Sequence, residues 1–365
     1  MRKHFKTFLF AALTCSLLLG AGLSAEAASK VAINETNFSM SLLREAQEAD
    51  KNGDGYLSKK EASRITDIQL FSAEKNDPFK GIEHFTNLKD FDYTAQAGQN
   101  GDDPEPDNNA ASVKHRLDLS NFKKLENVTI NCNTLYLKEI DLEGCSSLRD
   151  VDITCRGSVD SLNLKGCKNL REFTCMNTSA KKINLSNFKK LTRVAITIHL
   201  DDGSGNDHGY LKTLNLKNCS SLTYVGCSGV RTIKLKGADR LQKLDCSYAN
   251  LSSLDVSGKK QLQTIKCNDN PSLTQLDVCG CQNLRNLRCY NTGLTKLNVK
   301  QNTRLVRLLC SNTNIKKLNL KNNKKLWLLD CRDTNIRSLN LPKSLKNKEV
   351  KIRCEKEVPI TYKAK

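Results

Sequence analysis

The chain has 365 residues and a formal net charge of +19, from 58 Lys and Arg against 39 Asp and Glu, and 5% of its residues are aromatic. So large a positive charge favours anionic partners, although lysines also keep an exposed surface soluble. The low aromatic content disfavours a nucleic-acid binder, which needs aromatic side chains to stack on bases.

The first 27 residues have the features of a secretory signal. A basic start precedes an apolar stretch at residues 7–23, and Ala25-Glu26-Ala27 has the small-residue pattern of a cleavage site. The stretch is short for a transmembrane anchor, and no second apolar run follows it. We therefore expect a secreted or surface-held mature chain without a membrane span.

Residues 50–61 match the pattern of an EF-hand calcium loop. The expected ligands are Asp50, Asn52, Asp54, Tyr56 through its carbonyl group, Ser58 through a water, and Glu61. Apolar residues at helical spacing over residues 38–49 predict a helix that leads into the loop. Ala62 replaces the usual larger apolar residue and no second loop is present, so a degenerate acidic turn is the alternative. We expect one Ca²⁺, which fixes the cap over the first repeat.

Charge divides the chain near residue 110. Residues 28–110 hold nine basic and sixteen acidic side chains, whereas residues 111–365 hold 46 and 22. We predict five parts along the chain. They are a signal peptide (1–27), an EF-hand-like helical cap with a first irregular repeat (28–90), a linker (91–114), about ten repeats (115–345), and a closing strand with a tail (346–365).

The repeats have a period of 21 to 22 residues. Five cysteines mark this period most clearly: Cys246, Cys267, Cys289, Cys310 and Cys331. One unit runs Leu305-x-x-Leu308-x-Cys310, followed by Ile315-x-x-Leu318-x-Leu320. Alternation with a period of two predicts strands. A unit this short buries its apolar face only by stacking on its neighbours.

These residues resemble the leucine-rich repeat proteins, specifically the nested bacterial type related to the internalins. The resemblance covers most of residues 80–345 and implies a curved, β-rich solenoid of short parallel strands that is used for recognition. It also implies a protein secreted by a bacterium, most often a Gram-positive one, with an N-terminal cap. We expect no enzyme, because outside the repeat pattern only residues 199–210 offer candidate catalytic side chains.

Most of the sixteen cysteines have a structural explanation in this pattern. One set stands at an inward strand position, and a second stands at the turn position that Asn302 and Asn323 fill in later units. There we expect Cys or Asn to hydrogen-bond the backbone of the next unit. Side chains at equal positions on parallel strands point the same way, which is poor geometry for a disulfide. We therefore expect free buried thiols.

Residues that flank the inward positions form a mostly basic outward stripe. The candidate ligand surface is Lys243, Lys266, Arg288, Tyr290, Arg307 and Arg332. It suits an acidic protein or an anionic glycan or cell-wall polymer, although a plain solvated face is the alternative for each residue.

Two segments, 95–112 and 199–210, interrupt the period of the repeat. The second segment holds acidic residues and His208, which could be read as an acid/base or metal cluster. A flexible loop is the simpler interpretation.

The sequence thus predicts an extracellular binding protein, adhesin-like, with a calcium-stabilised cap. Non-specific retention on polyanions or the cell wall is the alternative, and a surface enzyme or a nucleic-acid binder is less favoured.

Overall fold

The structure is a computed structural model. It describes residues 31–32, 48–71, 79, 81–95, 115–132, 137–155, 159–178, 180, 183–198, 211–346 and 348–363. The expected signal peptide, residues 38–47 of the expected helix, residues 96–114 of the expected linker, and the segment 199–210 lie outside the described residues.

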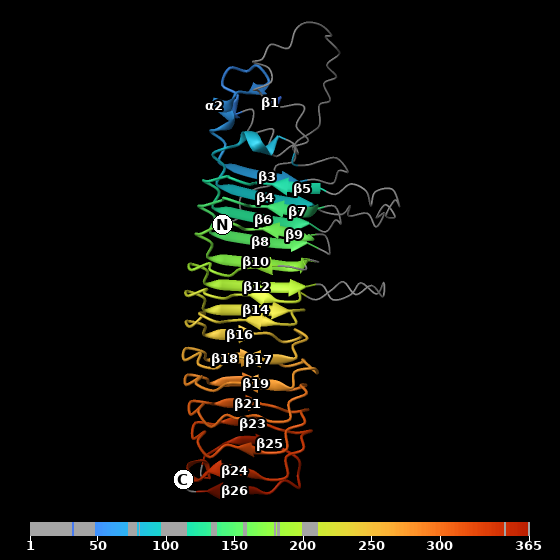
Figure 1. Ribbon diagram of the computed structural model, residues 1–365, viewed down its shortest axis with the longest axis vertical. Coiled ribbons are helices and arrows are strands. Elements are labelled where there is room, and N and C mark those ends of the chain that lie inside the picture. The colour runs from blue at the N-terminus through green and yellow to red at the C-terminus, as the bar shows by residue number, and fades with distance from the viewer. Residues whose placement is uncertain are drawn as a thin grey trace, which may run out of the picture.

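Thirteen parallel strands form one long sheet that runs along the molecule (Figure 1). They are β3 (Asp67–Phe71), β4 (Asp90–Ala95), β6 (Asn127–Cys132), β8 (Asp150–Cys155), β10 (Glu172–Thr178), β12 (Arg193–Ile198), β14 (Tyr224–Ser228), β16 (Lys243–Asp245), β18 (Thr264–Lys266), β20 (Asn286–Arg288), β21 (Arg307–Leu309), β23 (Leu328–Asp330) and β25 (Lys351–Arg353). Their order in the sheet is their order in the chain, so each turn of the chain adds one strand. We call each such turn a rung.

Shorter parallel sheets form a second layer, which we call the back layer. Its strands are β5 (His115–Asp118), β7 (Leu137–Asp141), β9 (Ser161–Asn163), β11 (Ile183–Asn184), β13 (Leu214–Asn215), β15 (Ile233–Lys234), β17 (Ser253–Asp255), β19 (Gln275–Asp277), β22 (Leu318–Asn319), β24 (Leu339–Pro342) and β26 (Ile360–Lys363). In Figure 1 the arrowheads of the back layer point opposite to those of the long sheet.

Helices are few and short in the described part of the chain. Those described from end to end are α2 (Lys59–Ala62) and the 3-10 helices η2 (Ile82–His84) and η4 (Lys343–Leu345), and Glu48 and Ala49 are also helical. Strand β1 (Val31–Ala32) pairs antiparallel with β2 (Tyr56–Leu57). A capping box starts α2: the Ser58 hydroxyl accepts the Glu61 N–H, and the Glu61 carboxylate accepts the Ser58 N–H. The larger helical cap expected from the sequence stays a prediction.

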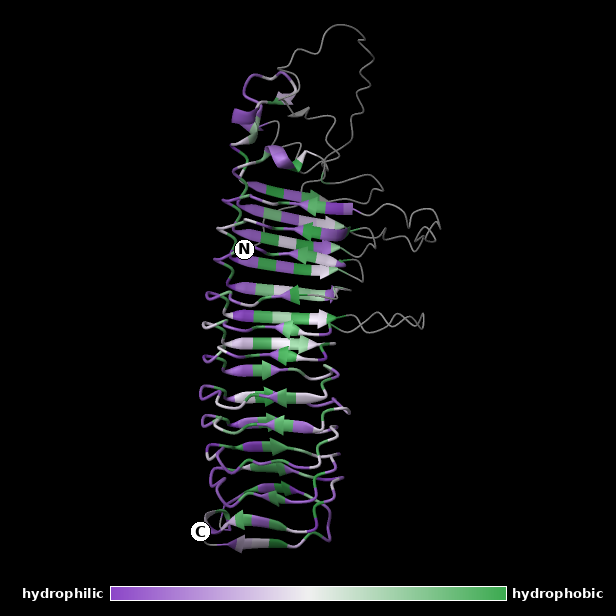
Figure 2. Ribbon diagram, viewed as in Figure 1, coloured by the Kyte–Doolittle hydropathy of each residue, from purple (hydrophilic) through white to green (hydrophobic). Residues whose placement is uncertain are grey.

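The core lies between the two layers. Burial alternates along the long strands, so that Val128, Ile130 and Cys132 of β6 point inward while their neighbours are exposed or half-buried. Leucines of the later rungs, such as Leu308 and Leu329, are fully buried. Figure 2 shows the apolar residues recurring on each rung. The predicted β-rich solenoid is confirmed as a stack of parallel strands.

Turn side chains form hydrogen bonds between the backs of adjacent rungs. Cys145 and Cys281 donate their S–H groups to Leu119 and Val256 carbonyls at 3.0 and 3.1 Å, one rung back. Asn302 and Asn323 each donate two hydrogen bonds, and both go to carbonyl groups of the preceding rung. The expected role is therefore present, but the direction was wrong: the partner is on the preceding rung. A donor pointing that way satisfies the carbonyl at the end of the previous back strand.

The cysteines of the described rungs are free thiols, nearly all of them buried. Burial raises the pKa of Cys175 and Cys281 to about 11 and that of Cys267 to about 12. A thiol with so high a pKa carries little thiolate at neutral pH and is chemically inert. The inward cysteines therefore act as small apolar core residues.

Candidate functional site

The exposed face of the long sheet consists of side chains aligned in columns by the parallel register. The first column begins Asp67, Asp90, Asn127, Asp150, Glu172 and continues Arg193, Tyr224, Lys243, Thr264, Asn286, Arg307, Leu328, Lys351. The sign of this column thus changes between β10 and β12. A second column beside it carries Asp92 and Asp152 on the early strands and Lys266 and Arg288 on the later ones.

Close packing of acidic groups affects their ionisation on the early strands. Desolvation, followed by the nearby Glu172 carboxylate, raises the pKa of Asp150 above its ordinary value. Desolvation also raises the pKa of Asp152. The early part of the face is therefore an acidic surface where burial disfavours the charged carboxylates, and at Asp150 the repulsion from Glu172 is partly offset by Arg171 and Arg149.

The six residues of the candidate ligand surface all lie on the later, basic part of this face, but they do not form one cluster. Lys266, Arg288 and Tyr290 line a shallow hollow of about 410 Å³. Lys243 and Arg307 belong to the first column and are separated by β18 and β20. Arg332 follows β23 and binds Asp330 with Nε–Oδ1 and guanidinium–Oδ2 distances of 3.0 and 2.7 Å.

Two further tyrosines line the hollow, and sequence analysis missed both. Tyr224 lies on β14, where its ring packs across Gly226: a Cβ there would lie 2.7 Å from the tyrosine hydroxyl. Arg193 stacks over the Tyr224 ring, with 4.2 Å from the guanidinium carbon to the ring centroid. The second is Tyr248, which follows β16 and is 62% exposed. The hollow therefore presents three tyrosines beside Lys266 and Arg288.

Tyr248 occupies a backbone position that suits other residues far better. Its φ is +57°, in the left-handed region, and the matching positions on neighbouring rungs hold Gly229, Asp269, Asn291, Asn312 and Asp333. Gly, Asn and Asp tolerate this conformation, whereas a bulky aromatic residue in it is strained. The repeat itself contains the signal that could have found this residue, since Tyr248 is the one aromatic residue in a column of Gly, Asn and Asp. Strain of this kind is characteristic of binding sites.

The Tyr248 ring is held in place by its neighbour on the next rung. A hydrogen bond to Asp269, followed by that carboxylate's charge, raises the pKa of the Tyr248 hydroxyl. Lys266, which also lines the hollow, is likewise fixed, with 2.7 Å between its Nζ and Oδ2 of Asp245. These contacts pre-orient the polar groups of the hollow and reduce the entropy lost on binding.

Trp327 forms a second aromatic feature of this basic face. It precedes β23 and is 40% exposed. Arg307 and Lys351 approach its ring, with 5.5 and 5.2 Å from their charged groups to the centroid. Tyr56, Tyr248 and Trp327 are the large apolar side chains that stand exposed on the described surface, and two of them lie here.

The expected calcium loop turns around its first carboxylate. Asp50 accepts the N–H groups of Gly53 and Gly55 at 2.8 and 3.0 Å, and Gly55 has a φ of +76°, which the sharp turn requires. Glu61 closes the loop, because its carboxylate accepts the Lys51 N–H at 2.9 Å and the Ser58 hydroxyl at 2.7 Å. The Ser58 hydrogen bonds lower the pKa of Glu61.

The donor chemistry of this loop fits a hard cation. Its side chains and the Tyr56 carbonyl supply oxygen ligands, and Leu57 anchors the loop in the core at 1% exposure. Over the described residues, however, no group of three or more His, Cys, Asp or Glu side chains is arranged to hold a metal ion. The fit therefore depends on the order of the oxygen donors and on the turn, and calcium remains a prediction.

No family model matches the chain. Disease resistance protein RPP2A from Arabidopsis thaliana is 30% identical over 132 residues, a match that covers 35% of this chain and 10% of the relative. The chain therefore spans about a tenth of the length of this curated relative.

Several solved structures are similar at low identity. An internalin (inlF) from Listeria monocytogenes is 15% identical with a TM-score of 0.44, covering 93% of this chain and 99% of that chain. The functional domain of InlJ from Listeria monocytogenes, which includes a cysteine ladder, is 19% identical with a TM-score of 0.29, covering 87% and 80%. A leucine-rich repeat protein from Leptospira interrogans is 15% identical with a TM-score of 0.43, covering 70% and 79%. Since these scores are below 0.5, the assignment of a leucine-rich repeat solenoid depends on this chain's own repeat and strand register.

Within the described ranges, no helix is long and apolar enough to cross a membrane.

Proposed function

We propose that this chain is a secreted or cell-surface recognition protein, not an enzyme, and that it binds a partner protein through the tyrosine-lined hollow of β14–β20. The observation that carries this proposal is Tyr248, an exposed aromatic residue in a left-handed backbone position. Tyr and Arg dominate the binding energy of protein interfaces. The hollow combines three tyrosines with Arg288 and Lys266. Lys266 is already paired with Asp245, so Arg288, which forms no ion pair among the described residues, is the group that favours an acidic partner side chain.

Replacing Tyr248 by Asn tests this proposal, because Asn occupies the same position on two later rungs. Relief of the left-handed strain should raise the free energy of unfolding by about 1 kcal/mol. Loss of the ring should weaken partner binding by about tenfold or more. The variant should therefore be more stable and less able to bind, which a general folding defect cannot produce.

The measurement uses residues 28–365 as bait for solubilised extracellular proteins, followed by affinity measurement with the purified partner. Tyr56→Asn, which removes an exposed tyrosine far from the hollow, is the matched control. We expect the wild type and the control to retain the partner and Tyr248→Asn to lose it. Equal binding by all three proteins would contradict the assignment of the hollow.

The second part of the proposal is that the N-terminal loop binds one structural Ca²⁺. The residues that would hold it are Asp50, Asn52, Asp54, Tyr56, Ser58 and Glu61. The ion would neutralise the loop carboxylates, and its binding energy would add to the stability of the first rungs. Support comes from the order of the oxygen donors and from the closing contact between Glu61 and Lys51.

Thermal unfolding of residues 28–365 tests the calcium site. We expect millimolar calcium to raise the melting temperature relative to chelator, and Asp50→Ala with Glu61→Ala to abolish this shift. The shift is the readout, because losing the Glu61 capping box lowers stability with or without the ion. No shift in the wild type would reduce the loop to an acidic turn.

A further inference from the structure

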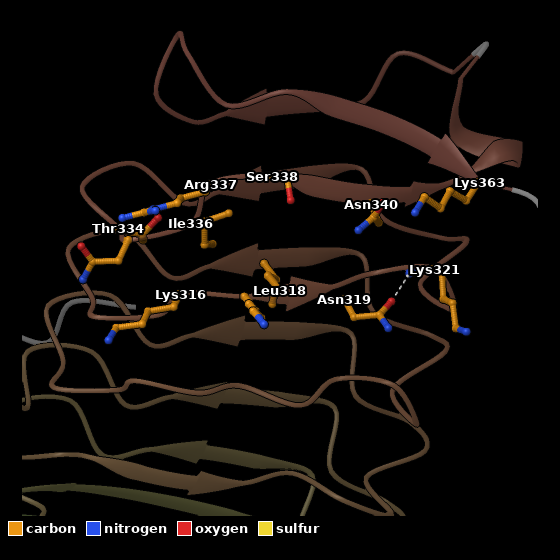
Figure 3. Close-up of a pocket in the computed structure, with 12 residues that line it drawn as sticks. Lys316, Leu318, Asn319, Lys321, Thr334, Ile336, Arg337, Ser338, Asn340 and Lys363 are labelled. Atoms are coloured by element: carbon orange, nitrogen blue, oxygen red, sulfur yellow. Dashed lines mark hydrogen bonds between the residues drawn. The ribbon is translucent and has the colours of Figure 1, made fainter.

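A large groove lies on the back layer near the C-terminal end of the solenoid, on the face opposite to the tyrosine-lined hollow. It has a volume of about 1110 Å³ and is lined by residues of three successive rungs. Figure 3 shows Lys316 and Arg337 at one end, Lys321 and Lys363 at the other, and Leu318, Ile336 and Ser338 between them. We call it the basic groove.

Every charged residue that lines the basic groove is positive. The five are Lys316, Lys317, Lys321, Arg337 and Lys363. None of them forms an ion pair with an acidic side chain of the described residues, whereas Lys165, Lys259 and Lys266 elsewhere all do. Their charge is therefore available to a ligand.

The repeat explains both the charge and the hollow shape. Leu318 pairs with Leu339 on the next rung, so Lys316 and Arg337 share one column, and Lys317 and Ser338 share the next. At the far end Lys363 pairs with Pro342, which takes the place of Lys321 on the middle rung. The short side chains of Ser338 and Asn340 on the middle rung thus leave a depression. Lys316 and Arg337 lie at one end of this depression, and Lys321 and Lys363 lie at the other.

The back-layer column that contains Asn319 carries acidic side chains on earlier rungs but none on the rungs of the groove. On β17 and β19 it holds Asp255 and Asp277, whose carboxylates accept the N–H two residues later at 2.8 Å. On the rungs of the groove the same turn contact is made by an amide: Asn319 accepts the Lys321 N–H at 3.2 Å. Asp and Asn serve this turn equally well, since both have the required oxygen. Asn in the groove keeps the turn and removes the negative charge.

We propose that the basic groove binds a linear acidic polysaccharide. Cations at both ends match anionic groups spaced along a chain. Between them, Asn319, Asn335, Asn340, Thr334 and Ser338 offer amide and hydroxyl groups that suit sugar hydroxyls. No aromatic side chain lines the groove, so it has no platform on which nucleic-acid bases can stack. The site is separate from the tyrosine-lined hollow, and one chain can hold a partner protein and an acidic glycan at once.

The test compares two variants of residues 28–365 that lose the same charge. The groove variant carries Lys316→Gln, Lys317→Gln, Lys321→Gln and Arg337→Gln. The control carries Lys123→Gln, Lys124→Gln, Lys168→Gln and Lys189→Gln, all exposed lysines on early rungs. Heparin serves as the sulfated probe, polygalacturonate as the carboxylated probe, and a short DNA duplex as the competing polyanion.

We expect the groove variant to lose about tenfold or more in affinity for at least one polysaccharide at physiological salt, and the control to lose less than about twofold. Tyr248→Asn should bind the polysaccharide like the wild type, so this result is independent of the proposed protein partner. Equal losses in the two charge variants would show a net-charge effect and overturn the groove. Tighter binding of DNA than of both polysaccharides would overturn the ligand class, and no polysaccharide binding by the wild type would overturn the proposal.

Discussion

The early and late rungs share one core but differ in what they expose. The early strands of the long sheet are up to seven residues long, as in β10, and carry acidic columns. The later strands, such as β18 and β20, have three residues and carry Lys and Arg. Inward residues stay buried on both, because the stack is stable only if the core is continuous. The difference teaches that the outward positions are free to vary, so function is found there.

Truncating the shared core should have the largest effect of any single change. Leu308 on β21 is fully buried, and Leu308→Ala should cost about 2–5 kcal/mol of unfolding free energy by leaving a cavity. Arg307→Ala, next to it on the exposed face, should cost under about 0.5 kcal/mol. Chemical denaturation of both variants measures the contrast. Similar costs at the two positions would show that the inward and outward positions are wrongly assigned.

Removing a turn side chain should cost less unfolding free energy than truncating the core, and the cost should be larger on the late rungs than on the early ones. Asn323→Ala removes two donors to buried carbonyls and should cost about 1–3 kcal/mol. Cys145→Ala on an early rung removes one weak S–H bond and should cost about 1 kcal/mol. Hydrogen exchange of the neighbouring amides would localise each loss. A larger loss for the cysteine would mean that sulfur packing outweighs hydrogen bonding in this column.

Neutralising an acidic residue of the first column should have the smallest effect on stability, and this effect should depend on pH. Because the folded chain raises the pKa of Asp150, the charged group opposes folding, and stability is lost as the pH rises through that pKa. Asp150→Asn should therefore raise the melting temperature at neutral pH by on the order of 1 °C. The gain should vanish below the ordinary aspartate pKa, where the wild-type group is also neutral. A gain independent of pH would point to a change in packing or hydrogen bonding instead of the carboxylate charge.

Much of the fold was predictable because the repeat is local and regular. Alternation in Leu305-x-x-Leu308-x-Cys310 indicates a strand, and its recurrence every 21 to 22 residues requires stacking. The same logic identified the buried thiols. The sequence did not show which rung the turn residues bond to, because that depends on how successive rungs are offset. Nor did it combine the candidate residues into a site: Lys266, Arg288 and Tyr290 share a hollow, whereas Lys243 and Arg307 do not.

By itself, then, the sequence determined the period, the inward residues and the buried cysteines, but it placed the change of charge near residue 110, whereas the exposed column changes sign between Glu172 and Arg193. The first three depend on contacts that repeat with the chain, so that one unit predicts the next. Only the tertiary structure decided where the outward residues meet. Tyr224, Tyr248 and Tyr290 are up to 66 residues apart in sequence, and they line one hollow because parallel stacking places equivalent positions on neighbouring rungs side by side. The basic groove arises in the same way, from Ser338 and Asn340 on the middle rung beside Arg337 and the lysines of the two adjacent rungs.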